Sequence, residues 1–526
     1  SEKMKKHILI FYLIVSALGI SSCSDFLDVP LKSSIATSNF FKTQQDFDMA
    51  LNGAYHMMTS AEWDSGHRWG NYFEGFLFLG RVGTDECFTS YGDNEAQISN
   101  YTFTPSNYIV SRTWYDQYVG ISRANMVIDR MASTKVEMTQ NERDRILGEA
   151  YFLRGFYYFI LARYYGEVPL VLQEVVDVAA MNTDKAPLAK VYEQIVSDFK
   201  QAESLLPLKN VNGRAHRYAA TAFLAKVYLQ MSGEPLKDGA AAELAAQSAY
   251  AVIKSGQFEL VKNYFSLFDG TNEYSSEYIF DADFSNKEDA THYGGQVGTT
   301  DGVPNPYDLY WVQIVSCKEF YEKFNEKDQR REAIADYRYV DVDGEPVIDR
   351  NPEAIGDNYY VYKFRHPLKK ADRGDTWVNW SNPLNFPILR YADILLTYAE
   401  AVNRSKNGLT TEALEYVNQV RRRGFGVDIN TANAGIDLPM MGVEEFNKAI
   451  LQERSFELSF EGHRWFDLVR FGKLEEAVKS LNKYDKTKEL TQQAKNVKPR
   501  HVILPIPQDV IDASNGKITQ NPLWAN

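Results

Sequence analysis

Three carboxylates in the C-terminal half of the chain have the spacing of one helical face. Glu453, Glu457 and Glu461 follow at i, i+4 and i+8, so a helix would place them side by side. Such a face could hold a metal ion or supply an acid/base pair, but no Glu-x-x-His motif accompanies it. Arginines that could pair with these carboxylates stand close by, at positions 421–423, 454, 464 and 470. We therefore expect a structural ion-pair network here rather than a catalytic centre.

The short motifs of common enzyme classes are absent from the sequence. It contains no His-Glu-x-x-His, no Cys-x-x-Cys, no Gly-x-Ser-x-Gly and no glycine-rich phosphate loop. The run 341–344, Asp-Val-Asp-Gly, has only the start of a calcium loop and is better explained by a hairpin turn. We expect no cofactor and assign no metal site. A carboxylate pair for glycoside hydrolysis stays open, because its separation is spatial rather than sequential.

Charge and aromatic content point to a different class of function. The net charge is -13 and no basic patch stands out, which argues against nucleic acid as a partner. The chain has 33 Tyr, 30 Phe and 8 Trp, so aromatics make up 13% of it. Several of them lie in polar, glycine-containing segments between helices, where they either pack under the loop or face a ligand. Sugar rings stack on such faces, so we expect a glycan site among these loops.

Helical periodicity dominates the rest of the sequence. The clearest amphipathic stretch is 149–166, which Gly166 and Pro169 bring to an end, and a second runs from Tyr218 to Met231. Further helices are expected at 44–59, 113–132, 188–206, 242–255, 388–404, 410–422, 444–461 and 472–482.

These helices form pairs of about 30–35 residues rich in Ala, Tyr and Leu, a pattern similar to tetratricopeptide hairpins that stack on one another. The pattern is interrupted at about 257–387, where short strand-like runs occur at 278–280 and 359–362. We expect a mostly α-helical fold with a few short strands. A single body spans 23–526, with a helical scaffold at about 40–256 and 388–485 and an irregular, loop-rich section between them.

The N-terminus has the order of a bacterial lipoprotein signal. Lys5 and Lys6 precede an apolar run at 8–20, and small residues then lead to Cys23. This run is shorter than the about 20 residues that a membrane-spanning helix needs. We expect residues 1–22 to be cleaved and Cys23 to carry lipid; an ordinary cleaved signal with an incidental cysteine is the alternative. Two cysteines then remain, Cys87 and Cys317, which leaves one disulfide possible.

Motifs spread from end to end resemble those of the SusD/RagB family of outer-membrane nutrient-binding lipoproteins. The early ones are 23–30 (CSDFLDVP), Trp114-Tyr115 with 123–125 (RAN), and 153–158 (LRGFYY) with 165–170 (YGEVPL). The later ones are 387–396 (PILRYADILL), 399–401 (AEA), 453–454 with 461–470 (EGHRWFDLVR), 504–507 (LPIP) and 520–522 (QNP).

The resemblance implies a lipid-anchored protein on the outer face of the outer membrane that acts as a lid for a SusC-like TonB-dependent β-barrel transporter. It implies binding of oligosaccharides, or of peptides in some members, without catalysis. It also implies that ligand is held by the loops after the first long helix and by the irregular section. The candidate ligand residues in these regions are Trp63, Trp69, Arg81, Asp85, Tyr91, Tyr310, Trp311, Arg373, Trp377 and Trp380.

Three other functions are weighed against glycan capture. A peptide-binding member of the same family would rely on strand-like backbone pairing and charged pockets. A surface glycoside hydrolase would need two carboxylates facing each other across a groove. A structural adaptor would seal the transporter without touching a ligand.

Overall fold

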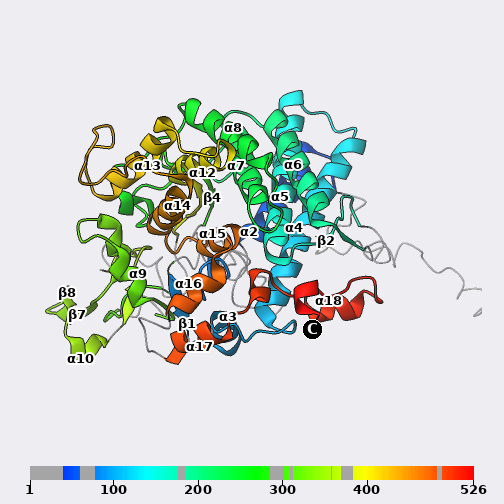
Figure 1. Ribbon diagram of the computed structural model, residues 1–526. Coiled ribbons are helices and arrows are strands. Elements are labelled where there is room, and N and C mark those ends of the chain that lie inside the picture. The colour runs from blue at the N-terminus through cyan, green and yellow to red at the C-terminus, as the bar shows by residue number, and fades with distance from the viewer. Residues whose placement is uncertain are drawn as a thin grey trace, which may run out of the picture.

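The computed structural model is mostly helical, with a few short strands (Figure 1). The residues that it describes are 40–59, 77–89, 91–175, 184–284, 298, 301–307, 312–356, 358–368, 383–481 and 488–525, without the side chains of 488–491. Cys23 and the expected signal at 1–22 lie outside these residues. The expected mostly α-helical fold class is confirmed.

Helices follow one another along most of the chain. Their bounds are α2 Gln44–Thr59, α3 Asp93–Ser99, α4 Tyr108–Ser133, α5 Gln140–Tyr165, α6 Leu188–Leu205, α7 Arg217–Ser232, α8 Ala241–Lys254, α9 Lys318–Lys323, α10 Pro352–Ile355, α12 Tyr391–Ser405, α13 Thr411–Gly424, α14 Val443–Glu457, α15 Arg464–Arg470, α16 Leu474–Ser480, α17 Lys488–Asn496 and α18 Gln508–Ala513.

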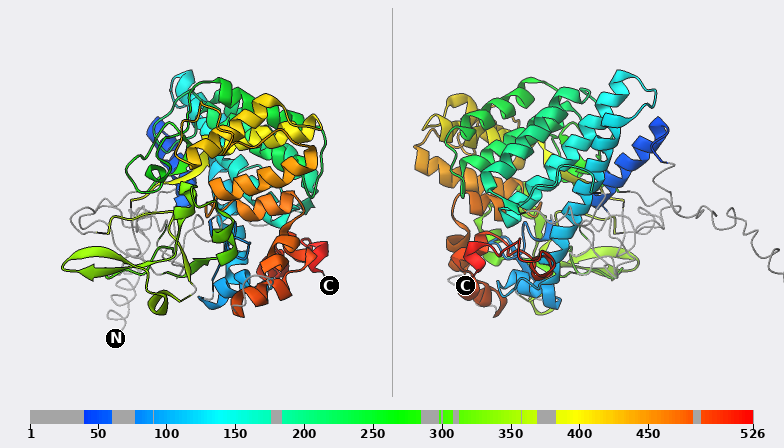
Figure 2. Two further views of the ribbon diagram at one scale, coloured as in Figure 1. Left: turned by 60° about the vertical axis from the view of Figure 1, so that its left-hand side comes forward. Right: turned by 90° about the vertical axis from the view of Figure 1, so that its right-hand side faces the viewer.

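Most of the longer helices form a stack in which each contacts the next. α2 packs on α4, α4 on α5, and the order continues through α6, α7 and α8. α8 then packs on α12, and α12 packs on α13 and α14. Residues 255–385, which contain most of the short strands, are therefore an insertion between two neighbouring helices of the stack (Figure 2). The arrangement has the hairpin stacking that the sequence pattern indicates.

The central helix α5 shows why these residues form a stack. Thr139 caps its first turn in a capping box with Glu142, and Gly166 ends it with a φ of 73°. Arg154 is buried in its middle, where the guanidinium donates to both oxygens of Asp198 on α6 at 2.7 and 2.9 Å. The same guanidinium donates to the Asn125 side chain of α4 at 2.9 Å. One guanidinium therefore ties three helices together, by an ion pair to α6 and a hydrogen bond to α4.

Tyrosines account for much of the aromatic content of this stack. Tyr157 of α5 is fully buried, and its hydroxyl donates to the carbonyl of Ala54 on α2 at 2.6 Å. Tyr165 donates to the carbonyl of Val110 on α4 at 2.6 Å. The ring of Tyr157 requires a glycine at position 120 of α4, because a Cβ there would lie 2.4 Å from this ring. These rings fill the core while their hydroxyls bind backbone groups of neighbouring helices.

The strands form small antiparallel sheets. Four of them make one sheet in the order β1 Cys87–Thr89, β5 Ile314–Ser316, β9 Tyr359–Val361 and β6 Ile334–Ala335. Three two-stranded pairs are β4 Tyr278–Ala282 with β10 Phe386–Arg390, β2 Val168–Pro169 with β3 Lys185–Ala186, and β7 Arg338–Val342 with β8 Glu345–Asp349. The strand-like runs at 278–280 and 359–362 are thus confirmed as strands. β1 is the edge strand through which residues 77–89 join the inserted section.

The run at 341–344 is the tip of a hairpin, as its turn residues indicate. β7 and β8 pair in register from Arg338 with Asp349 to Val342 with Glu345. Asp343 and Gly344 form the turn with φ values of 56° and 85°. Positive φ at both central residues is the geometry of a two-residue hairpin turn.

Several helix predictions differ from the structure at one end. The helices expected at 113–132 and 149–166 begin earlier, at Tyr108 and Gln140. The helix expected at 388–404 begins at Tyr391, because Phe386–Arg390 is a fully buried strand paired with β4. The helix expected at 444–461 ends at Glu457, since Phe460 and Gly462 both have positive φ, at 61° and 80°. Glu461 therefore does not share a helical face with Glu453 and Glu457.

The two cysteines are not bridged. Both are buried, and neither takes part in a disulfide. Cys87 lies in β1 opposite Ser316 of β5, and Cys317 directly follows that partner residue. Burial raises the pKa of the Cys87 thiol well above its ordinary value. The disulfide that the sequence left open is not formed in this structure.

Candidate functional site

The carboxylates singled out first from the sequence belong to a buried ion-pair network. Glu457 accepts from Arg330 at 3.1 Å, from Arg390 at 3.0 Å and from Arg423 at 2.5 Å. None of these side chains is more than 1% exposed. Burial opposes ionisation of Glu457, but the three guanidinium groups outweigh it and lower its pKa to about 2. Such a carboxylate holds no proton to give near neutral pH.

Glu461 joins the same network from the turn after α14. It accepts from Lys363 at 2.5 Å and from Arg390 at 2.6 and 2.8 Å. Glu453 pairs with Arg330 at 2.8 Å and with Arg421 at 2.5 Å. The structural ion-pair network expected at these glutamates is confirmed. It fastens the inserted section, through Arg330 and Lys363, to the helical scaffold.

Residues 77–89 are fastened in the same way, and two predicted ligand residues do the fastening. Arg81 is fully buried and donates to both oxygens of Asp301 at 2.8 and 2.9 Å. Asp85 is also buried, and it accepts from Arg464 at 2.7 and 2.8 Å and from Lys323 at 3.4 Å. Burial opposes ionisation of Asp85, but Arg464 and Lys323 keep its pKa below its ordinary value. Neither charged group presents a surface to a ligand.

A close backbone approach completes this fastening. The carbonyl of Gly80 accepts from the Trp465 amide at 2.9 Å. A Cβ at Gly80 would lie 2.1 Å from the carbonyl oxygen of Gly462. No residue other than glycine fits this contact without moving the backbone.

The segments that flank the predicted ligand loops share a small core of their own. Val303, Ala335, Ile355, Tyr360 and Tyr362 are buried together in it. Tyr307, Val312 and Leu368, which flank the undescribed segments 308–311 and 369–382, pack against the same cluster. Asp301, two residues before Val303, holds Arg81. Residues 77–89, which follow the undescribed segment 60–76, are thereby joined to the core that lies beside the other two loop regions. We call this small core, together with Asp301 and residues 77–89, the frame.

Of the remaining predicted ligand residues, only Tyr91 is described, and it is 55% exposed. Trp63, Trp69, Tyr310, Trp311, Arg373, Trp377 and Trp380 lie outside the described residues. Sequence reasoning missed the partners Asp301, Lys323 and Lys363. No local pattern could have found them, because each is more than 90 residues from the group that it binds.

Two carboxyl groups with raised pKa values bear on the hydrolase alternative. Burial, above all, raises the pKa of Glu86 to about 8 and that of Asp281 to about 7. Their side chains are 1% and 6% exposed. A general acid must touch its substrate, so neither group has the exposure that glycoside hydrolysis needs.

The part of the chain that the structure describes contains neither a cluster of metal ligands nor a helix that could span a membrane. No group of three His, Cys, Asp or Glu side chains in these residues could hold a metal ion. Within the same residues, no helix combines the length and apolar character needed to cross a membrane.

Comparison with known proteins places the chain in a family. Residues 276–524 match the model of the SusD family, and residues 25–229 match a SusD-like model described as starch-binding associating with outer membrane. The chain belongs to the SusD family. A SusD-like protein P2 from Formosa agariphila is 26% identical over 99% of the chain and 100% of its own length.

Solved SusD-family structures show the same fold. A SusD homolog from Bacteroides thetaiotaomicron is 28% identical, with a TM-score of 0.80 over 92% of this chain and 98% of its own. Surface glycan-binding protein A from the same organism, solved in complex with laminarihexaose, is 21% identical with a TM-score of 0.72 over 91% and 99%. At that identity the second likeness concerns the fold alone.

Proposed function

We propose that this SusD-family protein captures oligosaccharides at the cell surface and delivers them to a SusC-like TonB-dependent transporter in the outer membrane. The observation that carries the proposal is family membership, with one matching model described as starch-binding associating with outer membrane. The flanks of the aromatic loops, which share one frame, support it. The protein binds its ligand without chemical change.

The ligand contacts would come from the loop aromatics. Trp63 and Trp69 precede the segment that Arg81 fastens. Trp311 lies in sequence between Tyr307 and Val312, which pack on the small core, and Trp377 follows Leu368, which packs on the same core. Tyr310, Arg373 and Trp380 belong to the same loops, and Tyr91 adds an exposed ring beside β1. Arg81 and Asp85 would act indirectly, by holding the frame from which the aromatic faces project. Stacked aromatic faces bind the apolar side of sugar rings, and polar neighbours would select the hydroxyls.

Lipid at Cys23 would tether the protein to the outer membrane. A tether at one end leaves the folded body free to move against the transporter, as a lid requires. Replacement of Cys23 by Ser should release the protein from the membrane fraction without changing its glycan affinity. A Cys23→Ser protein that stays in that fraction after a carbonate wash would contradict lipid attachment.

Titration calorimetry of the purified protein is the decisive test of glycan capture. Laminarihexaose is the first ligand to try, because a structural neighbour was solved with it, and maltohexaose is the second, because of the starch-binding family description. We expect a Kd in the micromolar to millimolar range. Trp311→Ala and Trp377→Ala should each weaken binding roughly 5- to 30-fold, as loss of one stacking face costs about 1–2 kcal/mol.

Two tyrosines make a matched pair for the same experiment. Tyr91→Ala should weaken binding, whereas Tyr115→Ala, which removes a similarly exposed ring on α4, should leave it unchanged. Absence of binding across a broad oligosaccharide panel would refute glycan capture. Binding of peptides instead, found by mass spectrometry of co-purifying material, would assign the site to peptides. Release of reducing sugar from any of these glycans would show an enzyme.

A further inference from the structure

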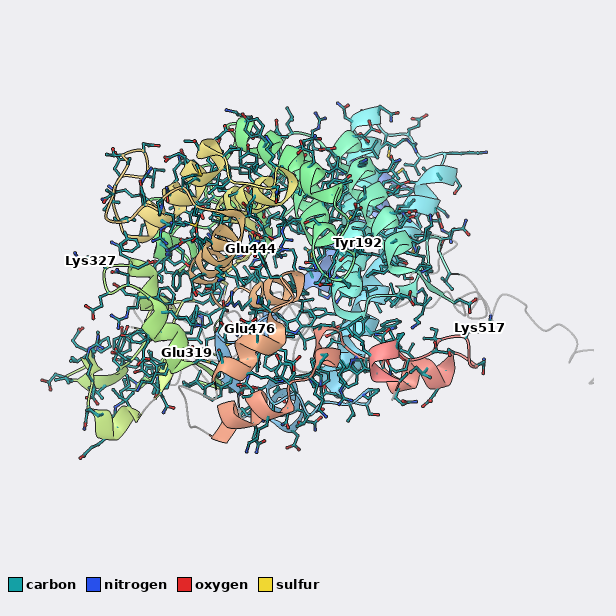
Figure 3. The ribbon with its side chains drawn as sticks, viewed as in Figure 1. Tyr192, Glu319, Lys327, Glu444, Glu476 and Lys517 are labelled. Atoms are coloured by element: carbon teal, nitrogen blue, oxygen red, sulfur yellow. The ribbon has the colours of Figure 1, made fainter. Side chains whose placement is uncertain are left out.

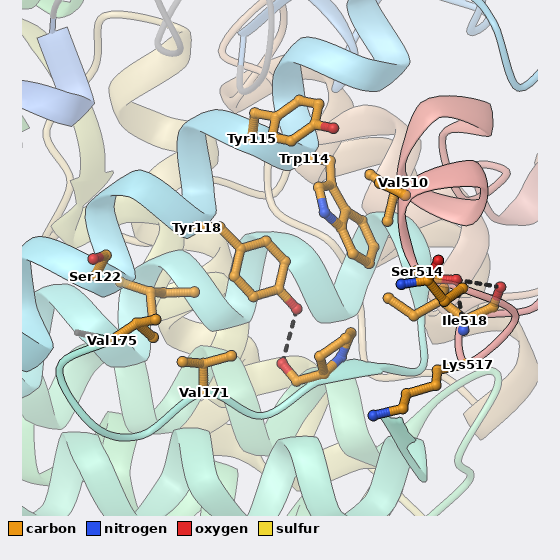
Figure 4. Close-up of a pocket in the computed structure, with 14 residues that line it drawn as sticks. Trp114, Tyr115, Tyr118, Ser122, Val171, Val175, Val510, Ser514, Lys517 and Ile518 are labelled. Carbon is orange, nitrogen blue, oxygen red and sulfur yellow. Dashed lines mark hydrogen bonds between the residues drawn. The ribbon is translucent and has the colours of Figure 1, made fainter. Parts of the chain in front are cut away.

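A cavity lies between α4 and the C-terminal segment, apart from the loop region. Its volume is about 690 Å³, within the range of pockets that hold small molecules. Its walls come from α4, from the segment 169–175 after β2, and from residues 510–518 (Figure 4). Lys517 marks the cavity at the opposite end of the molecule from Glu319 and Lys327, which belong to the inserted section (Figure 3).

The walls of this cavity are mostly apolar. Trp114 and Tyr118 provide aromatic faces with ring centroids 5.1 Å apart, and Tyr115 continues them to the surface, where it is 43% exposed. The aliphatic part of the lining consists of Ile121, Pro169, Val171, Val175, Val510, Ala513 and Ile518. Such a lining favours a ligand with an apolar body.

Two polar groups of the lining are already engaged within the protein. The Tyr118 hydroxyl donates to the carbonyl of Pro169 at 2.8 Å. Ser514 donates to the carbonyl of Ile511 at 2.7 Å and accepts from the Ile518 amide at 3.0 Å. A sugar ring carries several hydroxyls that need partners, so this lining suits a glycan poorly.

A cationic side chain lines the same cavity. Lys517, on the C-terminal segment, borders it together with Asn515. An ammonium group beside an apolar cavity favours an anion at the end of an apolar body. From the apolar lining and this charge, we propose that the cavity binds an amphiphile with one acyl chain and an anionic head, as in a fatty acid. The proposal does not depend on glycan capture.

Sodium dodecanoate, titrated below its micelle-forming concentration into the full-length protein, is the probe. We expect saturable binding with one site per chain and a micromolar Kd. Octanoate, which is four methylenes shorter, should bind at least tenfold more weakly, because each buried methylene contributes about three- to fourfold in affinity.

Two pairs of variants locate the site. Ala513→Trp should fill the cavity and raise the dodecanoate Kd at least tenfold, whereas Ala251→Trp, at an exposed position on α8, should not change it. Lys517→Met should raise the Kd for dodecanoate several-fold and leave that for neutral 1-dodecanol unchanged. Lys448→Met, at an exposed position on α14, is the charge-matched control.

Three results would overturn the proposal. The first is no saturable binding of dodecanoate to the wild-type protein. The second is equal affinity in Ala513→Trp and wild type, provided that circular dichroism shows both to be folded. The third is a Lys517→Met protein that binds dodecanoate as tightly as wild type, which would exclude recognition of the anionic head.

Discussion

Replacement of Asp281 by Asn should stabilise the protein at pH 8 and change its stability little near pH 4. Asp281 lies in β4 and is 6% exposed. Burial is the main cause that raises its pKa from 3.8 to about 7, and the nearby carboxylates of Asp283 and Glu273 add to it. Its Oδ2 atom makes no hydrogen bond within the described part of the chain. An amide therefore replaces the protonated carboxyl with little loss of contacts.

The sign of the effect follows from proton binding. Between pH 4 and pH 7 the folded protein retains the Asp281 proton, whereas the unfolded chain has lost it. The unfolded state thus binds fewer protons, and the free energy of unfolding falls as pH rises through this window. The difference between 3.8 and about 7 corresponds to about 4 kcal/mol lost in wild type by pH 8. The amide of the Asp281→Asn variant does not titrate, so the variant keeps this stability.

Urea unfolding of both proteins from pH 4.5 to pH 8, followed by tryptophan fluorescence, measures this difference. Glu86 adds a slope of the same sign in both proteins, because its pKa is raised to about 8. Burial lowers the pKa of His216 and His463 to about 4, which gives the opposite slope below pH 6.5. These contributions cancel when the variant is subtracted from wild type. A pH-independent difference, or an Asn variant less stable than wild type at pH 8, would refute the reasoning.

Three further outcomes test the fastening of the frame and the burial of the core. Gly80→Ala should lower the free energy of unfolding in the urea titration by about 1–3 kcal/mol or more, since the new Cβ would meet the Gly462 carbonyl. Gly239→Ala is the control and should be near neutral in the same titration, because open space surrounds that position. Arg154→Met should cost about 3–5 kcal/mol because Asp198 is left buried without its partner, and Arg154→Met with Asp198→Asn should recover part of that loss. Both cysteine thiols should resist a thiol reagent in the native protein and react after unfolding, because both are buried.

The helical stack could be predicted because its information is local. The apolar period of 149–166 and the stop at Gly166 predict the C-terminal part of α5, and the observed helix begins earlier, at Gln140. The strand Phe386–Arg390 was missed because it is buried on every side, and a short apolar run of this kind looks the same in a strand and in a buried helix. The end of α14 was missed because a positive φ at Phe460, a bulky residue, has no sequence signature.

The candidate site was predictable only as a region. Arg421 and Arg423 are near Glu453 and Glu457 in sequence, so this part of the network could be anticipated. The partners Arg330 and Arg390 are distant in sequence and were missed. Arg81 and Asp85 lie near the first loop aromatics in sequence, which suggests ligand contact. Their partners Asp301 and Arg464 lie 220 and 379 residues away and could not be anticipated. Loop aromatics have no periodicity that would distinguish a packed ring from an exposed one. The sequence alone could therefore not show that the Tyr91 ring is exposed.

The same long separations set the order in which the chain can fold. The carboxyl group of Glu86 accepts a hydrogen bond from the Phe460 amide, 374 residues further on. Asp85 forms its ion pair with Arg464, 379 residues further on. A chain that folds from its N-terminus can complete the early helices, since their partners come soon afterwards. Residues 77–89, and the frame that they complete, acquire their final contacts only after nearly the entire polypeptide has been made. The frame is thus the last part of this protein to form, and a truncation that removes residues after 458 should leave helices without it.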